Sequence, residues 1–175
     1  MRRVRYSVAM SLDGYIAGPG GEYDWIIMDP AIDFAAFFKA FDTVLMGRRT
    51  FEIALSQGSG GGMPGMRAIV FSRTLRAADH PGVTIVSTAA EQAVAALKAE
   101  PGKDIWLMGG GVLFRSLLDA DLVDTVEVGL IPVLLGRGIP LVETGAHAAR
   151  LRLSESKALP SGIVMLSYTI ERGAA

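Results

Sequence analysis

The chain has 175 residues and a mass of 18.5 kDa, the size of one ordinary domain, so we expect a single domain over residues 1–175. Half of the residues are hydrophobic, which excludes a disordered chain, and 17 basic residues balance 18 acidic ones, which argues against a nucleic-acid partner. Because the chain has no cysteine, disulfides, thiolate metal sites and a cysteine nucleophile are excluded, and its two isolated histidines predict no metal site.

The N-terminal residues predict a strand rather than a targeting signal. Apolar and polar side chains alternate over residues 4–10, as in a half-buried strand. The apolar stretch is interrupted by Ser7 and Ser11 and ends at Asp13, so it is not the core of a secretory signal. No run of about 18 apolar residues occurs anywhere in the chain. The sequence therefore predicts no membrane span and a cytoplasmic protein.

A helix is predicted next, beyond a glycine-rich loop at residues 18–21. We expect Asp29 to cap this helix, because Pro30 suits the first helical position. Its apolar stripe consists of Ile32, Ala35, Phe38 and Phe41. The elements predicted after it are a strand at residues 43–46, a helix at 50–55 and a flexible glycine segment at 58–62.

The second half of the chain begins with alternating elements and ends in strands. A capping box at residues 88–91 predicts a helix that runs to Glu100. The other predicted elements are strands at 68–71, 83–86 and 105–108, a helix at 112–118, and closing strands at 126–131, 151–158 and 163–170. This order predicts an α/β fold with a mostly parallel sheet and an antiparallel finish.

Three of the predicted strands end in residues that suit phosphate groups. These residues are Gly47, Arg48, Arg49 and Thr50 after the first, Ser72 and Arg73 after the second, and Gly109, Gly110 and Gly111 after the third. In open α/β sheets, ligands bind beyond the carboxyl ends of strands, where helix N-termini offer N–H groups to anions. Glycine admits close approach of the backbone, and arginine adds charge and a bidentate fork. The sequence therefore predicts a nucleotide with more than one phosphate group.

Each of these segments also has a purely structural interpretation. The glycines at 109–111 would serve close packing of a strand against a helix, and the arginines after Gly47 would be a solvated helix start. The chain contains neither a G-x-G-x-x-G fingerprint nor a G-x-x-x-x-G-K-[ST] loop. From the residues alone, both interpretations stay open.

Carboxylates in the first third of the chain are candidates for the chemistry. Asp29 is already explained by helix capping, whereas Asp33 lies one turn further on and has no such explanation. Asp33 also precedes Phe37 by four residues, so both side chains are expected on one helix face, where the ring could stack on a flat substrate. We therefore predict Asp33 as the catalytic residue, hydrogen-bonded to a polar ring. Trp25 is predicted to be core or a pocket wall.

Several segments, taken in order, carry a resemblance to a known family. They are residues 11–17 (SLDGYIA), 46–52 (MGRRTFE), 63–65 (MPG), 69–73 (IVFSR), 108–111 (MGGG) and 132–141 (PVLLGRGIPL). The chain resembles the dihydrofolate reductase fold family, and most closely its branch that contains the reductase domain of the bacterial riboflavin-biosynthesis enzyme. The resemblance runs from Arg5 to about Ile170. It implies a three-layer α/β sandwich with a mostly parallel central sheet and an antiparallel C-terminal strand.

The resemblance implies an NADPH-dependent reductase. Residues expected to hold the phosphates are Gly47, Arg48, Arg49 and Thr50, and those around the 2′-phosphate that distinguishes NADPH from NADH are Ser72 and Arg73. Residues expected at the pyrophosphate are Gly109, Gly110 and Gly111, with Val112 and Leu113 at the start of the following helix. Ala9 and Ile16 are expected to pack against the nicotinamide.

The riboflavin branch implies a pyrimidine- or pterin-like small-molecule substrate, most specifically 5-amino-6-(5-phosphoribosylamino)uracil, and a homodimer. Residues expected to line the substrate pocket are Asp13, Trp25, Asp33 and Phe37. Folate-reducing members carry one carboxylate on the first helix, and its equivalent position here falls near Ala31, between Asp29 and Asp33. Dihydrofolate reduction is therefore one alternative. A nucleotide-binding protein without catalysis is the other, because hydride transfer depends on positioning more than on any one side chain.

Overall fold

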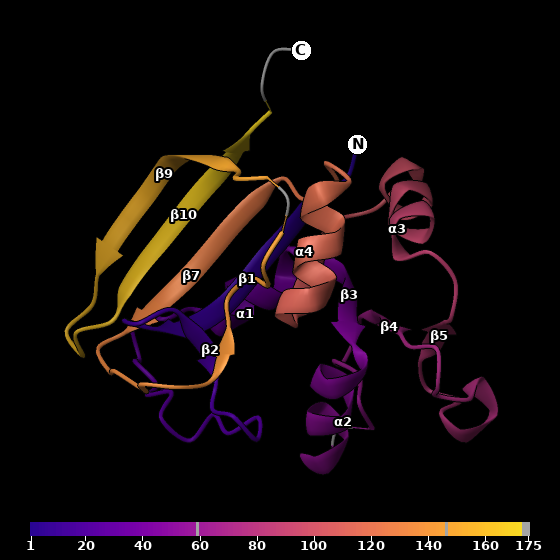
Figure 1. The fold of residues 1–175 in the computed structure, drawn as a ribbon, viewed down its shortest axis with the longest axis horizontal. Coiled ribbons are helices and arrows are strands. Elements are labelled where there is room, and N and C mark those ends of the chain that lie inside the picture. The colour runs from indigo at the N-terminus through magenta and orange to yellow at the C-terminus, as the bar shows by residue number, and fades with distance from the viewer. Residues whose placement is uncertain (59, 146, 173–175) are drawn as a thin grey trace.

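One eight-stranded sheet forms the middle layer of the structure (Figure 1). The computed structural model describes residues 1–58, 60–145 and 147–172. Its elements in chain order are β1 (Val4–Ser11), β2 (Tyr15–Ala17), α1 (Phe34–Lys39), β3 (Phe41–Gly47), α2 (Arg48–Ser56), β4 (Arg67–Phe71), a short 3-10 turn (Ala77–Asp79), β5 (Thr84–Val86), α3 (Ala90–Ala99), β6 (Asp104–Gly109), α4 (Gly111–Asp119), β7 (Thr125–Ile131), β8 (Ile139–Pro140), β9 (Arg150–Ala158) and β10 (Val164–Glu171).

The strand order in the sheet is β5-β4-β3-β6-β1-β7-β10-β9. In this order, the six neighbouring strands β5, β4, β3, β6, β1 and β7 all pair in parallel. β10 and β9 add an antiparallel edge, and the register between these two strands shifts between Ser167 and Tyr168. This arrangement confirms the predicted α/β class with a mostly parallel sheet. A separate small sheet pairs β2 with β8. Neither of these strands was predicted, because segments of three and two residues are too short to show a period of two.

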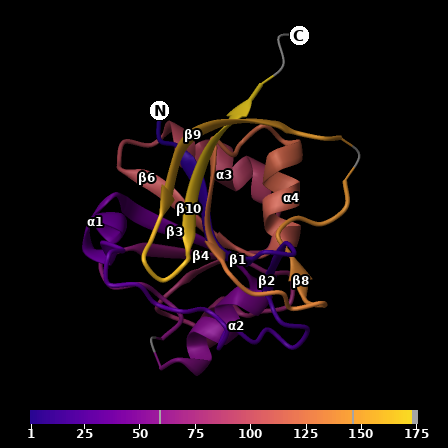
Figure 2. The ribbon, with the colours of Figure 1, turned by 90° about the vertical axis from the view of Figure 1, so that its left-hand side faces the viewer.

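Helices cover both faces of the inner strands, which gives the three layers (Figure 2). On one face, α3 and α4 pack against the apolar side of β1, where the ring of Phe114 stacks on Tyr6 with centroids 3.9 Å apart. On the other face, α1 and α2 pack against β3 and β6 and bury Phe51. There the indole N–H of Trp106 donates to the carbonyl of Ser7 at 3.0 Å. The apolar side chains predicted on one face of β1 therefore all belong to the first of these two cores, the one under α3 and α4.

Helix α1 begins later than the sequence predicted. Its first residue is Phe34, and Phe41, which was assigned to its apolar stripe, already begins β3. The carboxylate of Asp33 is the N-cap and accepts a hydrogen bond from the backbone N–H of Ala36 at 2.8 Å. The prediction that Asp29 caps this helix, and that Asp33 has no capping role, is therefore wrong.

Asp29 holds a different junction. Its side chain is buried, and its carboxylate accepts hydrogen bonds from the backbone N–H groups of Ala31 at 2.8 Å and of Ser161 at 3.0 Å. These bonds join the loop before α1 to the turn before β10. The carboxylate of Asp29, which the sequence assigned to the cap of α1, is thus bound by Ser161, a residue distant in sequence.

The capping box predicted at the start of α3 does not form. The N-cap is Ala89, which has no side-chain hydrogen bond to offer, and the helix begins one residue after it. The carboxylate of Glu91 instead accepts a hydrogen bond from the hydroxyl of Ser116 on α4. Glu91 therefore connects two neighbouring helices on the same face of the sheet.

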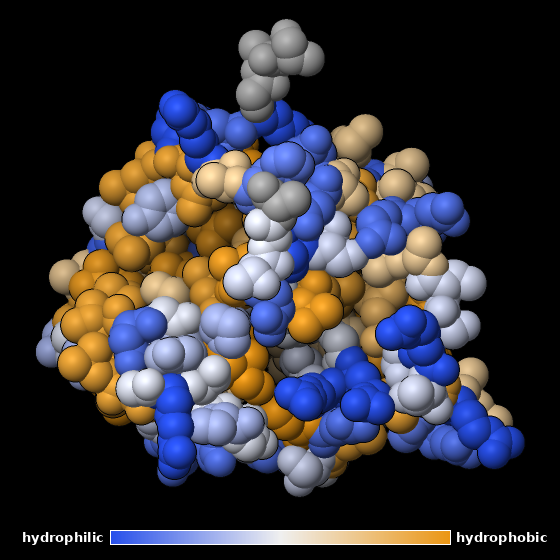
Figure 3. Space-filling view, in the orientation of Figure 1, coloured by the Kyte–Doolittle hydropathy of each residue, from blue (hydrophilic) through white to orange (hydrophobic). Residues whose placement is uncertain are grey.

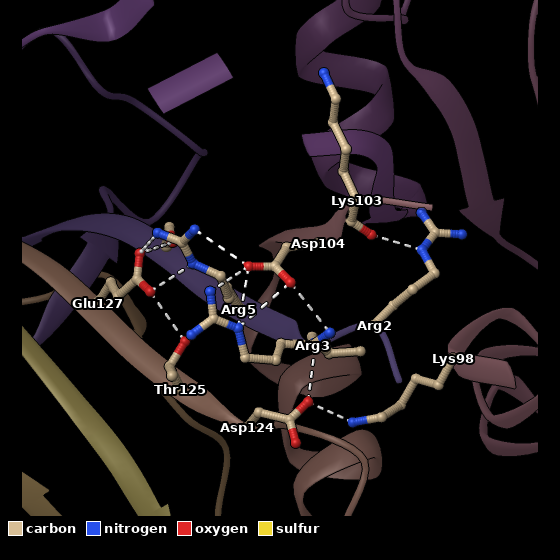
Figure 4. A network of polar contacts seen from close by, with 11 residues as sticks. Arg2, Arg3, Arg5, Lys98, Lys103, Asp104, Asp124, Thr125 and Glu127 are labelled. Carbon is tan, nitrogen blue, oxygen red and sulfur yellow. Dashed lines mark hydrogen bonds and ion pairs between the residues drawn. The ribbon is translucent and has the colours of Figure 1, made fainter. Parts of the chain in front are cut away.

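A network of charged side chains lies where β1, β6 and β7 begin (Figure 4). At its centre, Glu127 accepts two hydrogen bonds from the guanidinium of Arg5, at 2.7 and 2.8 Å, and one each from Ser7 and Thr125. Burial opposes ionisation of Glu127, but the hydrogen bonds and charge of Arg5, with the bonds from Ser7 and Thr125, hold its pKa below the usual range. The carboxylate is thus fully satisfied in its charged form.

Replacing Glu127 with glutamine should remove this charged acceptor and lower the free energy of unfolding at pH 7 by about 2 kcal/mol. Because the folded-state pKa is lowered, the stabilisation is present above the unfolded value of about 4.3 and is lost as pH falls through the folded value. Urea denaturation at pH 7 and pH 3.5 should therefore show a difference between the two proteins that shrinks at the lower pH.

Glu155 on the exposed strand β9 provides the matched control. Its replacement with glutamine should change the free energy of unfolding by less than about 0.5 kcal/mol. Equal stability of the wild type and Glu127→Gln at pH 7 would contradict the role assigned to the network.

Candidate active site

Two helix N-termini lie side by side at the carboxyl ends of β3 and β6 (Figure 1). Helix α2 follows Gly47 and helix α4 follows Gly110, and neither N-cap makes a side-chain capping bond. A Cβ atom placed on Gly47 would lie 3.7 Å from the backbone nitrogen of Gly110. The first N–H groups of both helices therefore share one space, which we call the glycine cradle. Such N–H groups and the helix dipoles favour an anion.

The three glycines after β6 have different roles. Gly109 has a φ of +142°, which favours glycine, and the peptide bond to Gly110 is cis. Cβ atoms on these two residues would lie 3.6 and 3.7 Å from the Thr50 hydroxyl, so both line the glycine cradle. A Cβ on Gly111 would lie only 2.8 Å from the carbonyl oxygen of Pro140. Close packing of α4 on β8 thus explains Gly111, as the structural interpretation of the sequence proposed.

The first turn of α4 contributes backbone rather than side chains to the glycine cradle. The side chain of Val112 is 71% exposed, whereas that of Leu113 is buried in the core between α4 and the sheet. The N–H groups at the start of this helix are the part that an anion can reach.

Arginines surround the same strand ends. Arg48 donates to the hydroxyl of Thr74 at 3.2 Å and lies 3.7 Å from the carboxylate of Glu52, so it connects the end of β3 with the turn after β4. Arg49 and Arg73 are exposed and make no hydrogen bond or ion pair with the residues that the structure describes. The guanidinium of Arg49, in the first turn of α2, and that of Arg73, after β4, therefore have no partner among the described residues and can bind an anion.

A cavity of about 530 Å³ lies beyond β4 and β5, next to the start of α3. Ser72 and Arg73 line it from one side, as the phosphate hypothesis requires, and the Ser72 hydroxyl accepts two backbone N–H bonds that shape its turn. Ser87 and Thr88 line the cavity as well and were not predicted. Both residues come directly after β5, just as Ser72 comes directly after β4, and this position could have identified them. From the sequence, Thr88 was instead assigned to the capping box.

The predicted nicotinamide and substrate walls lie further along the same edge. In β1, Ala9 pairs with Gly129 of β7 and lies three residues beyond the last β1–β6 pair, Tyr6 and Leu107. Ala9 and Trp25 both pack against an apolar cluster formed by the end of β7 and the turn between β9 and β10, which consists of Ile131, Leu159 and Ile163. Ile16 is half-buried in β2, the strand that pairs with β8.

Phe37 and Asp33 are placed differently from each other. The Phe37 ring lies edge-on to Trp106, with centroids 5.2 Å apart, and 5.0 Å from the ring of Phe41. It is thus part of the aromatic core under α1. Asp33 is exposed and engaged at the N-cap of that helix. That Asp33 contacts the substrate stays a prediction, but its lack of a capping role no longer supports it.

Asp13 joins the loop after β1 to the loop after β7. Its carboxylate accepts hydrogen bonds from the Ser11 hydroxyl at 2.6 Å and from the backbone N–H groups of Gly136 at 2.7 Å and Leu135 at 3.2 Å. The bond from Ser11 lowers the pKa of Asp13, and those from Gly136 and Leu135 lower it further. We call this arrangement the Asp13 latch.

Backbone pairing reinforces the Asp13 latch on both sides. The N–H of Leu12 donates to the carbonyl of Val133 at 2.9 Å, and the N–H of Leu141 donates to the carbonyl of Gly14 at 2.9 Å. The β2–β8 pair continues this contact. The two loops are therefore held together as one unit, and the role predicted for Asp13, substrate binding, competes with a role in positioning these loops.

Among the described residues, no group of three or more histidine, aspartate and glutamate side chains could hold a metal ion. No helix in the described part of the chain is long and apolar enough to cross a membrane.

Replacing Asp13 with asparagine should loosen the latch, because the amide has one accepting oxygen where the carboxylate uses two to hold Ser11, Leu135 and Gly136. Hydrogen exchange at the amides of Leu135 and Gly136 should accelerate about fivefold or more at pH 7, measured by NMR. Since the folded-state pKa is lowered, the wild type should show the same loosening only as pH falls through that lowered value. Asp24→Asn, in the loop that follows, is the control and should leave both amides unchanged. Unchanged exchange in Asp13→Asn would refute the latch.

Comparison with solved structures supports the fold. A Shewanella sp. PV-4 protein whose name assigns it to riboflavin biosynthesis superposes with a TM-score of 0.82 at 27% identity, covering 98% of this chain and all of that one. Dihydrofolate reductase from Enterococcus faecalis, solved with NADP(H), gives a TM-score of 0.71 at 18% identity and covers 97% of both chains. The fold is therefore dihydrofolate reductase-like, as the sequence resemblance implied.

Sequence comparison identifies the family. The chain is 34% identical over 178 residues to the uncharacterized protein YyaP of Bacillus subtilis, covering 95% of this chain and 94% of that protein. The family model of the RibD C-terminal domain matches residues 2–165. The protein with the glycine cradle and the Asp13 latch therefore belongs to the RibD C-terminal domain family.

Proposed function

We propose that the protein is an NADPH-dependent reductase of a pyrimidine- or pterin-like small molecule, of the 5-amino-6-(5-phosphoribosylamino)uracil reductase type. The observation that carries this proposal is the glycine cradle, where two helix N-termini without a side-chain cap meet and Arg49, in the first turn of α2, has no partner among the described residues. We further propose that the chain works as a single cytoplasmic domain over residues 1–175 and as a homodimer.

The residues at the sheet edge fit NADPH. The glycine cradle suits the pyrophosphate, because neither helix N-terminus has a side-chain cap among the described residues. Only backbone atoms lie near a Cβ placed on Gly47, and the Thr50 hydroxyl, itself a possible phosphate donor, is the nearest group over Gly110. Arg49 can approach the same phosphates. Arg73, with the hydroxyls of Ser87 and Thr88, suits the 2′-phosphate in the neighbouring cavity. When bound, NADPH supplies a hydride, and the protein's task is to hold and orient it. A dihydrofolate reductase of the same fold is solved with NADP(H).

The substrate is proposed to lie against Ala9 and Trp25, on the side of the Asp13 latch. Family membership favours a riboflavin-pathway pyrimidine, and the name of the Shewanella protein points to the same pathway. The site offers an apolar wall and positioned loops rather than an obvious proton donor. Orientation of the ring against the cofactor is thus the contribution that the proposal assigns to this chain.

A turnover screen tests the proposal directly. NADPH oxidation is followed with 5-amino-6-(5-phosphoribosylamino)uracil, dihydropterins and dihydrofolate, each as the sole acceptor. Turnover of the first would support the proposal, and turnover of dihydrofolate alone would favour dihydrofolate reductase. Tight NADPH binding with no turnover of any acceptor would favour a nucleotide-binding protein without catalysis.

Replacing Arg73 with alanine should weaken NADPH binding and leave NADH binding unchanged, because only NADPH carries the 2′-phosphate. Loss of one charge-assisted hydrogen bond, worth about 1.5–3 kcal/mol, corresponds to about a tenfold to hundredfold rise in Kd. Fluorescence titration with both cofactors measures the ratio. Arg76→Ala, in the next turn, is the control. Equal Kd values for NADPH and NADH in the wild type would contradict the assignment of Arg73.

Two substitutions of Asp33 separate its cap from a role in the reaction. Asparagine also caps helices well, so Asp33→Asn should keep the stability, whereas Asp33→Ala should lose about 1 kcal/mol in urea denaturation. If the carboxylate contacts substrate, Asp33→Asn lowers kcat while the Kd of NADPH stays unchanged. Full activity of Asp33→Asn on a verified substrate would end the catalytic assignment and leave Asp33 as a cap.

A further inference from the structure

The cavity beyond β4 and β5 has polar lining residues that the proposed 2′-phosphate does not use. Besides Ser72 and Arg73, it is lined by Glu91 and Ser116. Glu91 lies in the first turn of α3 and Ser116 lies in α4, so two neighbouring helices bring these side chains together. Both residues are half-buried. A carboxylate therefore shares the cavity with the guanidinium of Arg73, and the two groups attract different parts of a ligand.

The Glu91 carboxylate has capacity for a further hydrogen bond. It accepts a bond from the Ser116 hydroxyl, and no other side chain among the described residues donates to it. The bond from Ser116, with a smaller contribution from the backbone N–H of Glu91, lowers the pKa of this carboxyl, so it is charged at pH 7. A carboxylate can accept about four hydrogen bonds. A ligand in the cavity should therefore offer an N–H or O–H donor to Glu91.

The same cavity has an apolar wall. Phe71, Val86, Ala89 and Ala90 line it, and all but Ala89 also pack against the core under α3 and α4. Figure 3 shows hydrophobic and hydrophilic residues side by side in the region between α4 and β5. The volume of about 530 Å³ lies within the range of small-molecule pockets and leaves room for a ring besides a phosphate group. The lining therefore suits a flat base that carries an amino group.

We propose that Glu91 selects the base of the cofactor by accepting a hydrogen bond from the exocyclic amino group of adenine. Ser116 is a positioning residue, because its hydroxyl holds the carboxylate in place. The inference rests on the proposed function: the base and the 2′-phosphate are attached to the same ribose, so a phosphate bound by Arg73 brings the base into the same cavity. Hypoxanthine carries an oxygen in place of the amino group and would set one acceptor against another.

Fluorescence titration with NADPH and with its hypoxanthine analogue tests the inference. The wild type should bind NADPH about tenfold more tightly or better, because a charged acceptor rejects a base that lacks the donor. Glu91→Gln should bring the two Kd values within about twofold of each other, because an amide can accept from an amine and donate to an oxygen. Glu100→Gln makes the same change at the other end of α3, outside the cavity lining, and should keep the wild-type ratio.

Two substitutions of Ser116 test its positioning role. Ser116→Ala should lower the ratio of the two Kd values about threefold, because the carboxylate loses the hydroxyl that orients it. Ser116→Thr keeps a hydroxyl and should restore the wild-type ratio. A purely structural role of Ser116 would change the affinity for both cofactors alike and leave their ratio constant. An unchanged ratio in Ser116→Ala would therefore remove the positioning role.

Three results would overturn the selection of the base by Glu91 and leave the proposed reductase intact. They are equal binding of NADPH and its hypoxanthine analogue by the wild type, a wild-type ratio in Glu91→Gln, and tighter binding of NADPH but not of NADH by Glu91→Gln at an unchanged base ratio. The last result would mean that the carboxylate faces the 2′-phosphate instead of the base. A wild type that binds neither NADPH nor its analogue would overturn both proposals.

Discussion

The register of β1 between two parallel neighbours is the constraint on which the other elements depend. Carboxylates at the starts of β6 and β7 fix it, because Asp104 accepts the backbone N–H of Arg3 and Asp124 accepts that of Val4 at 2.8 Å. A slip of one residue would turn every β1 side chain to the opposite face. Tyr6 would leave the core beside α4, and Ala9 would leave the wall of the site.

The two ends of the parallel strands differ in how their polar groups find hydrogen-bond partners. At the edge where strands begin, Glu127 and Asp104 are paired with arginines in the network of Figure 4. At the opposite edge, the N-termini after Gly47 and Gly110 have no side-chain cap, and Arg49 has no partner among described residues. The paired charges that stabilise the sheet thus lie where the parallel strands begin, and the backbone and side-chain groups that can bind a ligand lie where they end. This is expected of a scaffold that carries a site on its loops.

Features with a local signal were predictable from the sequence, and features decided by distant partners were not. Glycine after a buried strand marks Gly47 and Gly109 directly, because no other residue allows the backbone to approach so closely. Local rules assigned the helix cap to Asp29 because Pro30 follows it, whereas in the structure Asp29 is bound by Ser161, 132 positions away, and Asp33 is the cap. Similarly, the carboxylate of Glu91 is taken by the hydroxyl of Ser116 on another helix rather than by the start of its own helix. The site's backbone frame could therefore be predicted, and the carboxylates' roles could not.

The shifted register beside β9 also bears on how the protein behaves when concentrated. β9 is an outer strand whose backbone edge is open, and such edges template the addition of further strands into fibrils. The shift between Ser167 and Tyr168 distorts that edge, and Arg152 and Lys157 place charges along it. A strand that docked there would lose its pairing partway along and bury like charges. Crowded solutions of this chain should therefore resist amyloid-like growth, even though the edge has no covering element among the described residues.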